Sequence, residues 1–268
     1  MLVVKADGTQ ETFERAKLES SLTKAGASAE DIAAIADIVE RTLAPNMSTA
    51  AIYRNAFTLL RKREAGTAAR YSLKRAVLEF GPSGFPFEAY LAEVFRTEGF
   101  EATTNAISQG ACVEHEIDVL LHKDGIKTYV EAKFHNTPGF KTDLKVVLYV
   151  KARIDDINKR EGESVRGLVV TNTKFTDMAR RYAECAGLPI LGWDYPDVDN
   201  LHQRIEQSGL YPVTALTSLS RREKLLLLSQ KVVLCNGLLR HTDALRSLGI
   251  SQGRHARLTQ EIGALCRT

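Results

Sequence analysis

The sequence predicts an α/β protein with a mixed β-sheet in the middle of the chain, a mostly helical segment before it and a helical segment after it. Three observations predict this arrangement. Asp124-Gly125 separates two alternating apolar runs, which is the strongest short signal of a β-hairpin. Helical and apolar strand patterns then alternate from residue 143 to residue 193, as in α/β domains. The run Gly81-Pro82-Ser83-Gly84-Phe85-Pro86 marks a boundary before this middle segment.

The composition is that of a soluble globular protein. The 268 residues are 44% hydrophobic and 26% charged, and this length suits two or three domains. No apolar run approaches the roughly 20 residues needed to span a bilayer. The first residues do not resemble a secretory leader. We therefore expect a cytoplasmic protein without a membrane partner.

The cysteines do not indicate a structural metal. Cys112, Cys185, Cys235 and Cys266 are scattered, with no CxxC pair and no nearby histidine at metal-ligand spacing. Neither a zinc site nor a disulfide framework is therefore predicted.

The charge is distributed unevenly along the chain. Residues 1–85 contain 12 basic and 10 acidic residues, residues 86–199 contain 14 and 19, and residues 200–268 contain 10 and 4. The net charge is therefore +2, then −5, then +6. A basic excess at the end of the chain is compatible with binding to a phosphate backbone, and equally with solvated helix surfaces.

The first segment reads as a short hairpin followed by helices. Strands are expected at residues 2–5 and around Thr12-Phe13, joined by a turn at Asp7-Gly8. Serine or threonine precedes two of the helical patterns as a candidate N-cap. Helices are expected over residues 16–25, from residue 29 after Ser28, over 50–63 after Ser48-Thr49, and over 67–80.

The middle segment begins with an amphipathic helix. Its apolar residues Phe87, Leu91, Val94 and Phe95 follow helical spacing, and Glu88 lies beside that stripe. A second helix, over 143–159, has the apolar stripe Val147, Val150, Ile154 and Ile157. Strands are expected at 112–122, 127–134, 167–171 and 189–193, with a further helix at 174–186.

The hairpin turn sets the expected position of two acidic residues. If Asp124-Gly125 forms a two-residue type I′ turn, paired positions sum to 249, so Asp118 faces Glu131 directly. Directly opposed β-carbons lie about 4.5–5.5 Å apart, and two carboxylates at that distance repel unless a cation lies between them. Alternation places Lys133 on the same face as Glu131, while the opposite face is apolar.

This geometry predicts a magnesium site. Asp118 and Glu131 are expected to hold Mg²⁺ or Mn²⁺, with the Ala132 carbonyl as a third ligand and Glu88 as a further carboxylate. Such an ion acidifies bound water and neutralises charge on a phosphate, and Lys133 is expected to orient the water. The alternative is a solvated strand face in which Lys133 pairs with Glu116 across the hairpin.

Three stretches of the middle segment carry a family resemblance: His115-Glu116-Ile117-Asp118-Val119, Tyr129-Val130-Glu131-Ala132-Lys133, and Val170-Thr171-Asn172-Thr173-Lys174-Phe175-Thr176. Together they resemble the Mrr-like branch of restriction endonucleases in the PD-(D/E)xK superfamily, over a domain at residues 86–197. The resemblance implies magnesium-dependent cleavage of DNA, with Asp118, Glu131 and Lys133 as catalytic residues. Many relatives have Gln-x-Lys where this chain has Glu-x-Lys, which weakens an assignment to restriction of modified DNA.

Residues that follow this motif are candidates for DNA contact. His135 comes directly after the strand, and Lys151 lies with Tyr149 on the polar side of the 143–159 helix. A polar helix face and an exposed strand end are the alternative interpretation.

Residues 1–82 resemble an ATP-cone, the regulatory nucleotide-binding domain of ribonucleotide reductases. The resemblance rests on Val3-Val4-Lys5-Ala6-Asp7-Gly8, Phe13-Glu14-Arg15-Ala16-Lys17-Leu18 and Ala69-Arg70-Tyr71-Ser72. It implies that Lys5, Arg15 and Lys17 contact the phosphates of ATP or dATP. Because the chain has no GxxxxGK[ST] loop, we expect nucleotide sensing rather than ATP hydrolysis.

Residues 200–268 are expected to be helical. The run from Leu216 to Leu228 resembles a degenerate helix-hairpin-helix entry without its glycine-rich hairpin, and it implies DNA contacts by Arg221, Arg222 and Lys224. A helical cap with these three side chains solvated is the alternative.

Together these features predict a nucleotide-regulated, magnesium-dependent DNA endonuclease. A nucleotide-sensing DNA-binding protein with an inactive nuclease-like fold is the first alternative, and an enzyme acting on a small phosphate ester is the second. Cutting both DNA strands would require two active sites and hence a homodimer.

Overall fold

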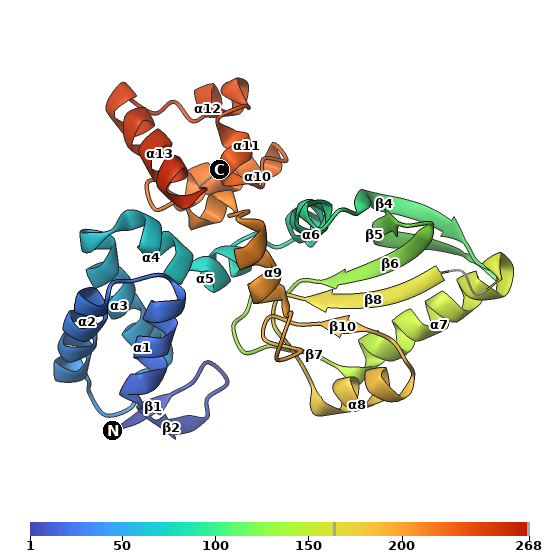
Figure 1. Cartoon of the computed structure of the whole chain (residues 1–268), viewed down its shortest axis with the longest axis horizontal. Helices are drawn as coiled ribbons and strands as arrows, with labels where there is room; N and C mark the ends of the chain where they lie inside the picture. The colour runs from blue at the N-terminus through green and yellow to red at the C-terminus, as the bar shows by residue number, and fades with distance from the viewer. Residues whose placement is uncertain (163–164, 267–268) are drawn as a thin grey trace. The chain divides into compact units, whose positions relative to one another are not determined.

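The computed structural model describes residues 1–162 and 165–266, and the chain divides into two compact units (Figure 1). One unit is Leu78–Leu210, and the other combines Met1–Val77 with the C-terminal region from Tyr211 onward. The sequence suggested three consecutive regions with the last beginning at residue 200, whereas α9 (Leu201–Ser208) belongs to the central unit. No helix in the described parts of the chain has the length and apolarity needed to cross a bilayer.

The central unit is built on a five-stranded mixed sheet with the order β10-β8-β6-β5-β4. Strands β4, β5 and β6 are antiparallel, whereas β6, β8 and β10 are parallel to one another. This confirms the mixed α/β sheet that the sequence predicts. The strands are β4 (Glu101–Gln109), β5 (Glu114–Lys123), β6 (Ile126–Lys133), β8 (Val165–Thr171) and β10 (Ile190–Leu191).

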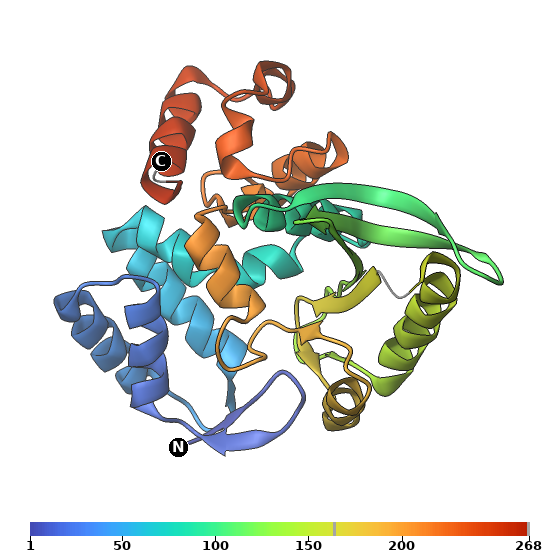
Figure 2. The same ribbon diagram turned by 45° about the vertical axis from the view of Figure 1, so that its right-hand side comes forward.

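Helices cover both faces of this sheet, as Figures 1 and 2 show. Helix α6 (Phe85–Thr97) contacts β4 and β5 on one face, and α7 (Leu144–Glu161) with α8 (Asp177–Cys185) lies on the other. The buried residues of α7 are Val147, Val150, Ile154 and Ile157, which is the stripe that helical spacing predicts. They pack with Ile117, Tyr129 and Val169 of the sheet.

The β5–β6 hairpin follows the predicted turn. Asp124 and Gly125 have φ angles of 52° and 76°, as a type I′ turn requires. The pairs run from Lys123↔Ile126 to Val119↔Val130, which is the predicted register. The ladder stops there, one pair short of Asp118 and Glu131, so the prediction that these two residues are direct cross-strand partners is wrong.

Strand β4 is the element that the sequence did not indicate. It pairs antiparallel with β5 along its length and forms the edge of the sheet. Ala102 and Ser108 are its buried residues, and the rest of Glu101–Gln109 is exposed or half-buried. Neither face of this strand is consistently apolar, so the alternation of apolar and polar residues that identifies a strand in a sequence is absent here.

The N-terminal part of the other unit matches the predicted hairpin and helices. Its strand order is β2-β1-β3, with β1 (Leu2–Val4), β2 (Gln10–Thr12) and β3 (Met47–Ser48). Ser28 and Ser48 cap their helices by accepting the backbone N–H groups of Asp31 and Ala51. The helices are α1 (Arg15–Lys24), α2 (Ala29–Thr42) and α3 (Thr49–Arg63).

The helix predicted over residues 67–80 is divided into α4 (Ala65–Tyr71) and α5 (Leu73–Leu78). At Ser72 the hydroxyl donates to the Ala69 carbonyl, and the backbone N–H lies close to the carbonyls of Ala68 and Ala69. Side-chain competition of this kind for helix carbonyls interrupts the regular pattern.

The C-terminal part is helical, as predicted. Ser220 and Glu223 form a capping box at the start of α10. Helix α13 packs against α4 of the N-terminal part, and Thr214 donates to the Ala76 carbonyl. The elements are the 3₁₀ turn η1 (Val213–Ala215), α10 (Arg221–Ser229), α11 (Cys235–Leu238), α12 (Thr242–Ser247) and α13 (Gln252–Leu265).

Gly167 allows α7 and the segment after α8 to approach β8 closely. A Cβ atom at this position would lie 2.7 Å from Leu188 Cδ1 and 2.8 Å from Ile154 Cγ1. We expect Gly167→Ala to destabilise the central unit by about 1–3 kcal/mol, because overpacking of a filled core forces neighbours to move. Urea unfolding followed by circular dichroism measures this change.

Arg166, the exposed neighbour on the same strand, provides the control. Arg166→Ala should change the unfolding free energy by less than about 0.5 kcal/mol. Equal stabilities of Gly167→Ala and the wild type would show that the core has room for the extra methyl group.

Candidate active site

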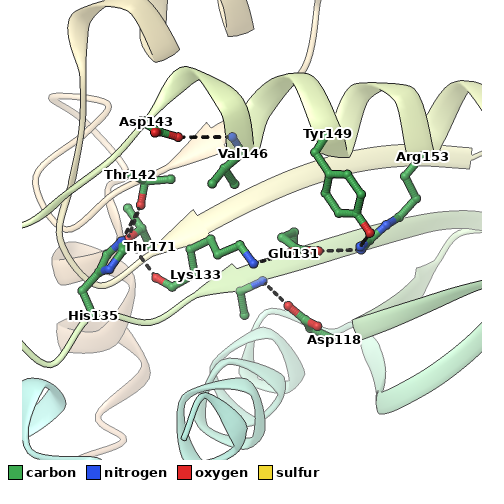
Figure 3. Close-up of polar contacts among 11 residues, drawn as sticks. Asp118, Glu131, Lys133, His135, Thr142, Asp143, Val146, Tyr149, Arg153 and Thr171 are labelled. Carbon is green, nitrogen blue, oxygen red and sulfur yellow. Dashed lines mark hydrogen bonds and ion pairs between the residues drawn. The ribbon is translucent and has the colours of Figure 1, made fainter. Parts of the chain in front are cut away.

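The centre of the candidate site is a buried carboxylate held by two cations. The side chain of Glu131, on β6, is only 5% exposed. Its Oε1 lies 2.6 Å from Lys133 Nζ, and its Oε2 lies 2.5 Å from Arg153 Nη1 (Figure 3). Glu131 therefore does not belong to a solvated strand face, and Lys133 pairs with Glu131 along its own strand.

Asp118 lies beside this pair at the end of the β5–β6 ladder. Its Oδ2 accepts the Ala132 backbone N–H at 2.7 Å. A strand N–H points toward the neighbouring strand in the plane of the sheet, so the Asp118 carboxylate lies between the strands rather than opposite Glu131 on one face. Burial and then the negative charge of Glu131 raise the pKa of Asp118.

Glu88 joins this acidic environment from α6. Burial raises the pKa of Glu88 to about 7, and the negative charges of Asp118, Glu116 and Glu131 add to the effect. Among the residues that the structure describes, no three Asp, Glu, His or Cys side chains are grouped to hold a metal ion. Glu88 is thus linked to Asp118 and Glu131 by the effect of their charges on its own pKa.

The donor set fits a magnesium or manganese ion. Mg²⁺ in proteins takes one or two carboxylates and completes its shell with carbonyls, waters and phosphate oxygens. Asp118 and Glu131 supply two carboxylates. The N–H and C=O of one strand residue point to the same neighbouring strand, so the Ala132 carbonyl lies on the Asp118 side of β6.

Arg153 is the site residue that the sequence reasoning missed. Its side chain is 10% exposed, and its Nη2 donates to the Tyr149 hydroxyl at 2.8 Å. Position 153 lies three residues after Val150 and four before Ile157, so helical spacing places it near the buried stripe of α7. A charged residue beside a buried apolar stripe was the sequence signal that could have identified Arg153 as a site residue.

Polar side chains fix the end of β6 just after Lys133. The Thr171 hydroxyl donates to the Lys133 carbonyl at 2.9 Å. The Asn172 amide accepts the His135 N–H and donates to the His135 carbonyl, both at 2.8 Å. His135 Nε2 lies 2.9 Å from Thr142 Oγ1, so this predicted DNA contact has an internal partner.

Lys151 lies on α7 outside this network. It forms an ion pair with Asp155 one turn along the helix. The structure therefore places Lys151 on a polar helix face, apart from the Glu131 contacts.

The three predicted phosphate ligands of the N-terminal unit all form ion pairs with acids of the same unit. Lys5 and Lys17 lie 2.8 Å and 3.2 Å from Glu11, and Lys17 lies 2.8 Å from Glu14. Arg15 contacts three carboxylates, those of Glu19, Asp37 and Glu40, at 2.6–2.7 Å.

The predicted basic residues of the C-terminal region differ in exposure. Arg221 and Arg222, at the start of α10, are exposed. Lys224 is half-buried, and its Nζ donates to the Thr214 carbonyl at 2.6 Å.

Glu88 gives the central unit a defined pH dependence. The folded protein binds this proton more strongly than the unfolded chain, because the pKa rises from 4.5 to about 7. The contribution of Glu88 is therefore fully present below pH 4.5 and is lost as the pH rises through 7. After allowance for solvent screening of a half-buried group, the loss should be about 1–2 kcal/mol.

Urea unfolding of the metal-free wild type and Glu88→Gln at pH 5 and pH 8 tests this dependence. The stability of Glu88→Gln relative to the wild type should be higher at pH 8 than at pH 5 by that amount. A difference that is the same at both pH values would contradict the assignment.

Three family models match the chain in succession. Residues 1–77 match the ATP cone domain, residues 82–201 match a restriction endonuclease model, and residues 211–266 match the AF1548-like C-terminal model. These matches confirm the first two resemblances drawn from the sequence, and the third describes the C-terminal helices.

Individual proteins are also similar to this chain. An uncharacterised protein of Archaeoglobus fulgidus is 42% identical over 126 residues, which are 47% of this chain and 71% of the relative. The crystal structure of AF1548, a protein of unknown function, is 32% identical, with a TM-score of 0.57 over 68% of this chain and 98% of that chain. A repair endonuclease from Pyrococcus abyssi is 24% identical over 41% of this chain and 46% of that chain, and its TM-score of 0.34 establishes no shared fold. The chain thus belongs to the same family as the AF1548 protein and combines an ATP cone domain, an Mrr-like restriction endonuclease domain and an AF1548-like C-terminal domain.

Proposed function

We propose that the protein is a DNA endonuclease that requires Mg²⁺ or Mn²⁺ and whose activity responds to ATP or dATP. One observation carries the proposal. Glu131, a buried carboxylate, lies between Lys133 and Arg153 and beside Asp118, within the residues that match the restriction endonuclease model. Perturbed carboxylates gathered at one place are typical of functional sites.

The environment of these carboxylates favours a dication. Asp118 and Glu131 are close enough for the charge of one to raise the pKa of the other, and Glu88 responds to both. A divalent cation among them would relieve this repulsion. When bound there, Mg²⁺ supplies Lewis-acid chemistry, neutralising charge on a phosphate and lowering the pKa of water.

The chain's own residues have separate roles in the proposed reaction. Asp118, Glu131 and the Ala132 carbonyl bind the ion, and the Ala132 N–H orients the Asp118 carboxylate. Lys133 places an ammonium group at the same carboxylate, where it is able to stabilise negative charge on the attacking oxygen and the phosphate. Thr171 holds the Lys133 backbone and so keeps this strand end in place.

Cleavage of supercoiled plasmid DNA tests the assignment. We expect the wild type to nick or cut DNA with Mg²⁺ and to be inactive with EDTA. Asp118→Asn and Glu131→Gln should lower the rate by at least about 100-fold, because each removes charge from the ion-binding pair. Lys133→Ala should lower the rate more than it lowers Mn²⁺ affinity.

Glu114→Gln is the matched control, since Glu114 is an exposed carboxylate at the start of the same strand as Asp118. It should cleave DNA at the wild-type rate. Full activity of folded Asp118→Asn and Glu131→Gln would refute the proposed site, whereas DNA binding by a wild type that never cleaves would favour the inactive DNA-binding alternative.

The proposed nucleotide site lies where β1 ends and α1 begins. Lys5 follows β1, Arg15 is the first residue of α1, and Lys17 is on its first turn. Their carboxylate partners are partly exposed, so phosphate oxygens are able to replace them as acceptors. Lys17 is 58% exposed, which makes it the most accessible of the three.

Titration with ATP by calorimetry tests this site. Lys17→Ala should weaken ATP binding about 10-fold, because it removes one charge-assisted contact. Arg15→Ala should also lower the unfolding temperature, since Glu19, Asp37 and Glu40 then lose their shared cation. Lys24→Ala, at the exposed end of the same helix, should leave ATP binding unchanged.

A further part of the proposal concerns DNA outside the active site. Arg221 and Arg222 are exposed on a region with a net charge of +6, which suits contact with a phosphate backbone. The described residues of one chain supply one proposed nuclease site, so cutting both strands in one event would require a homodimer.

A further inference from the structure

A second element reaches the carboxylate at the centre of the candidate site. Lys133 contacts Glu131 from the same strand, whereas Arg153 contacts it from α7, which covers that face of the sheet (Figure 3). The two cations bind different oxygens of the carboxylate, Oε1 and Oε2. Rotation of the Glu131 side chain would therefore break both contacts together.

Arg153 is itself held in place. Its Nη2 donates to Tyr149 Oη at 2.8 Å, and its Cζ lies 4.7 Å from the centre of the Tyr149 ring. Val150 and Ile154, on either side of it along α7, are buried in the core. The guanidinium is thus fixed by the helix, the tyrosine and the carboxylate.

One hydrogen-bond donor of Arg153 is left unsatisfied at this position. Its Nε is buried and has no hydrogen-bond partner. A buried donor without an acceptor is unfavourable, and an apolar residue beside this stripe would avoid that penalty. The contact with Glu131 is the feature that an apolar residue would not supply.

We propose that Arg153 is a positioning residue that fixes the Glu131 carboxylate in the orientation that binds the divalent cation. The inference rests on the proposed function. Residues that orient a metal ligand from behind typically change metal affinity 10–100-fold when they are replaced. Loss of Arg153 should therefore weaken cation binding, although the variant loses a positive charge close to the ion.

The opposite role would be that of a competitor that must leave Glu131 before the ion binds. Three features argue against it. The side chain is nine-tenths buried, it is anchored at Tyr149, and it contacts the carboxylate through Oε2. A carboxylate has about four lone-pair positions, so the Oε2 contact leaves others for an ion.

Binding of Mn²⁺ to the DNA-free full-length protein, measured by calorimetry, separates these roles. Arg153→Met keeps a long unbranched side chain and removes the charge and its hydrogen bonds. We expect its Kd for Mn²⁺ to rise about 10-fold or more. Arg153→Lys should recover part of the affinity, because lysine keeps the charge but lacks the planar fork that joins Glu131 to Tyr149.

Arg160→Met is the matched control, because Arg160 is an exposed arginine near the end of the same helix. It should bind Mn²⁺ as the wild type does. Circular dichroism and thermal unfolding establish that each variant is folded. If Arg153→Met does not fold, Tyr149→Phe removes one anchor of Arg153 and should still raise the Kd for Mn²⁺ by a few fold.

The outcomes distinguish this inference from the proposed function. The positioning role alone would be overturned if Glu131→Gln loses Mn²⁺ binding but folded Arg153→Met has an unchanged or lower Kd for Mn²⁺. Where Tyr149→Phe is used instead, an unchanged Kd would overturn it. A wild-type chain that binds no Mn²⁺ would overturn both. A raised Kd in Arg153→Met, partial recovery in Arg153→Lys and no change in Arg160→Met would support the positioning role.

Discussion

A charged carboxylate buried in a folded domain must be surrounded by cations or hydrogen-bond donors, and Glu131 imposes this requirement on the central unit. Its two partners come from different elements, so the distance between β6 and α7 has to suit an ion pair as well as apolar packing. The stripe of α7 and the missing side chain at Gly167 set that distance. Removing one partner of a buried pair generally costs about 3–5 kcal/mol, because the other charge is left uncompensated.

The same requirement accounts for the end of the β5–β6 ladder beside Asp118, where β5 and β6 themselves continue. A regular ladder would continue to the Asp118–Glu131 pair and set two carboxylates against each other. The ladder instead stops at Val119↔Val130, and Asp118 turns to the Ala132 N–H. The two acids remain close enough to influence each other, and each has a hydrogen-bonding partner in the protein.

The sequence predicted the parts of this fold that follow from local patterns. Asp124-Gly125 determined the hairpin register, and helical spacing identified the buried stripe of α7. The edge strand β4 was missed because its residues are mostly exposed and carry no alternation. Arg153 was missed for a different reason: an arginine on a helix usually reaches solvent, and only the position of Glu131 across the layer makes this one a buried partner.

The two units contain the same kind of ion pair at very different exposures. In the central unit, Lys133 and Arg153 hold a carboxylate that is 5% exposed, so water and salt have little access to the Glu131–Arg153 contact. In the N-terminal unit, Lys17 and its partner Glu14 are 58% and 55% exposed, and such a pair exchanges partners readily because water screens the attraction. A buried pair suits a site whose geometry must be fixed before the substrate arrives. An exposed pair suits a site whose cations must be released to bind the phosphates of a diffusing nucleotide.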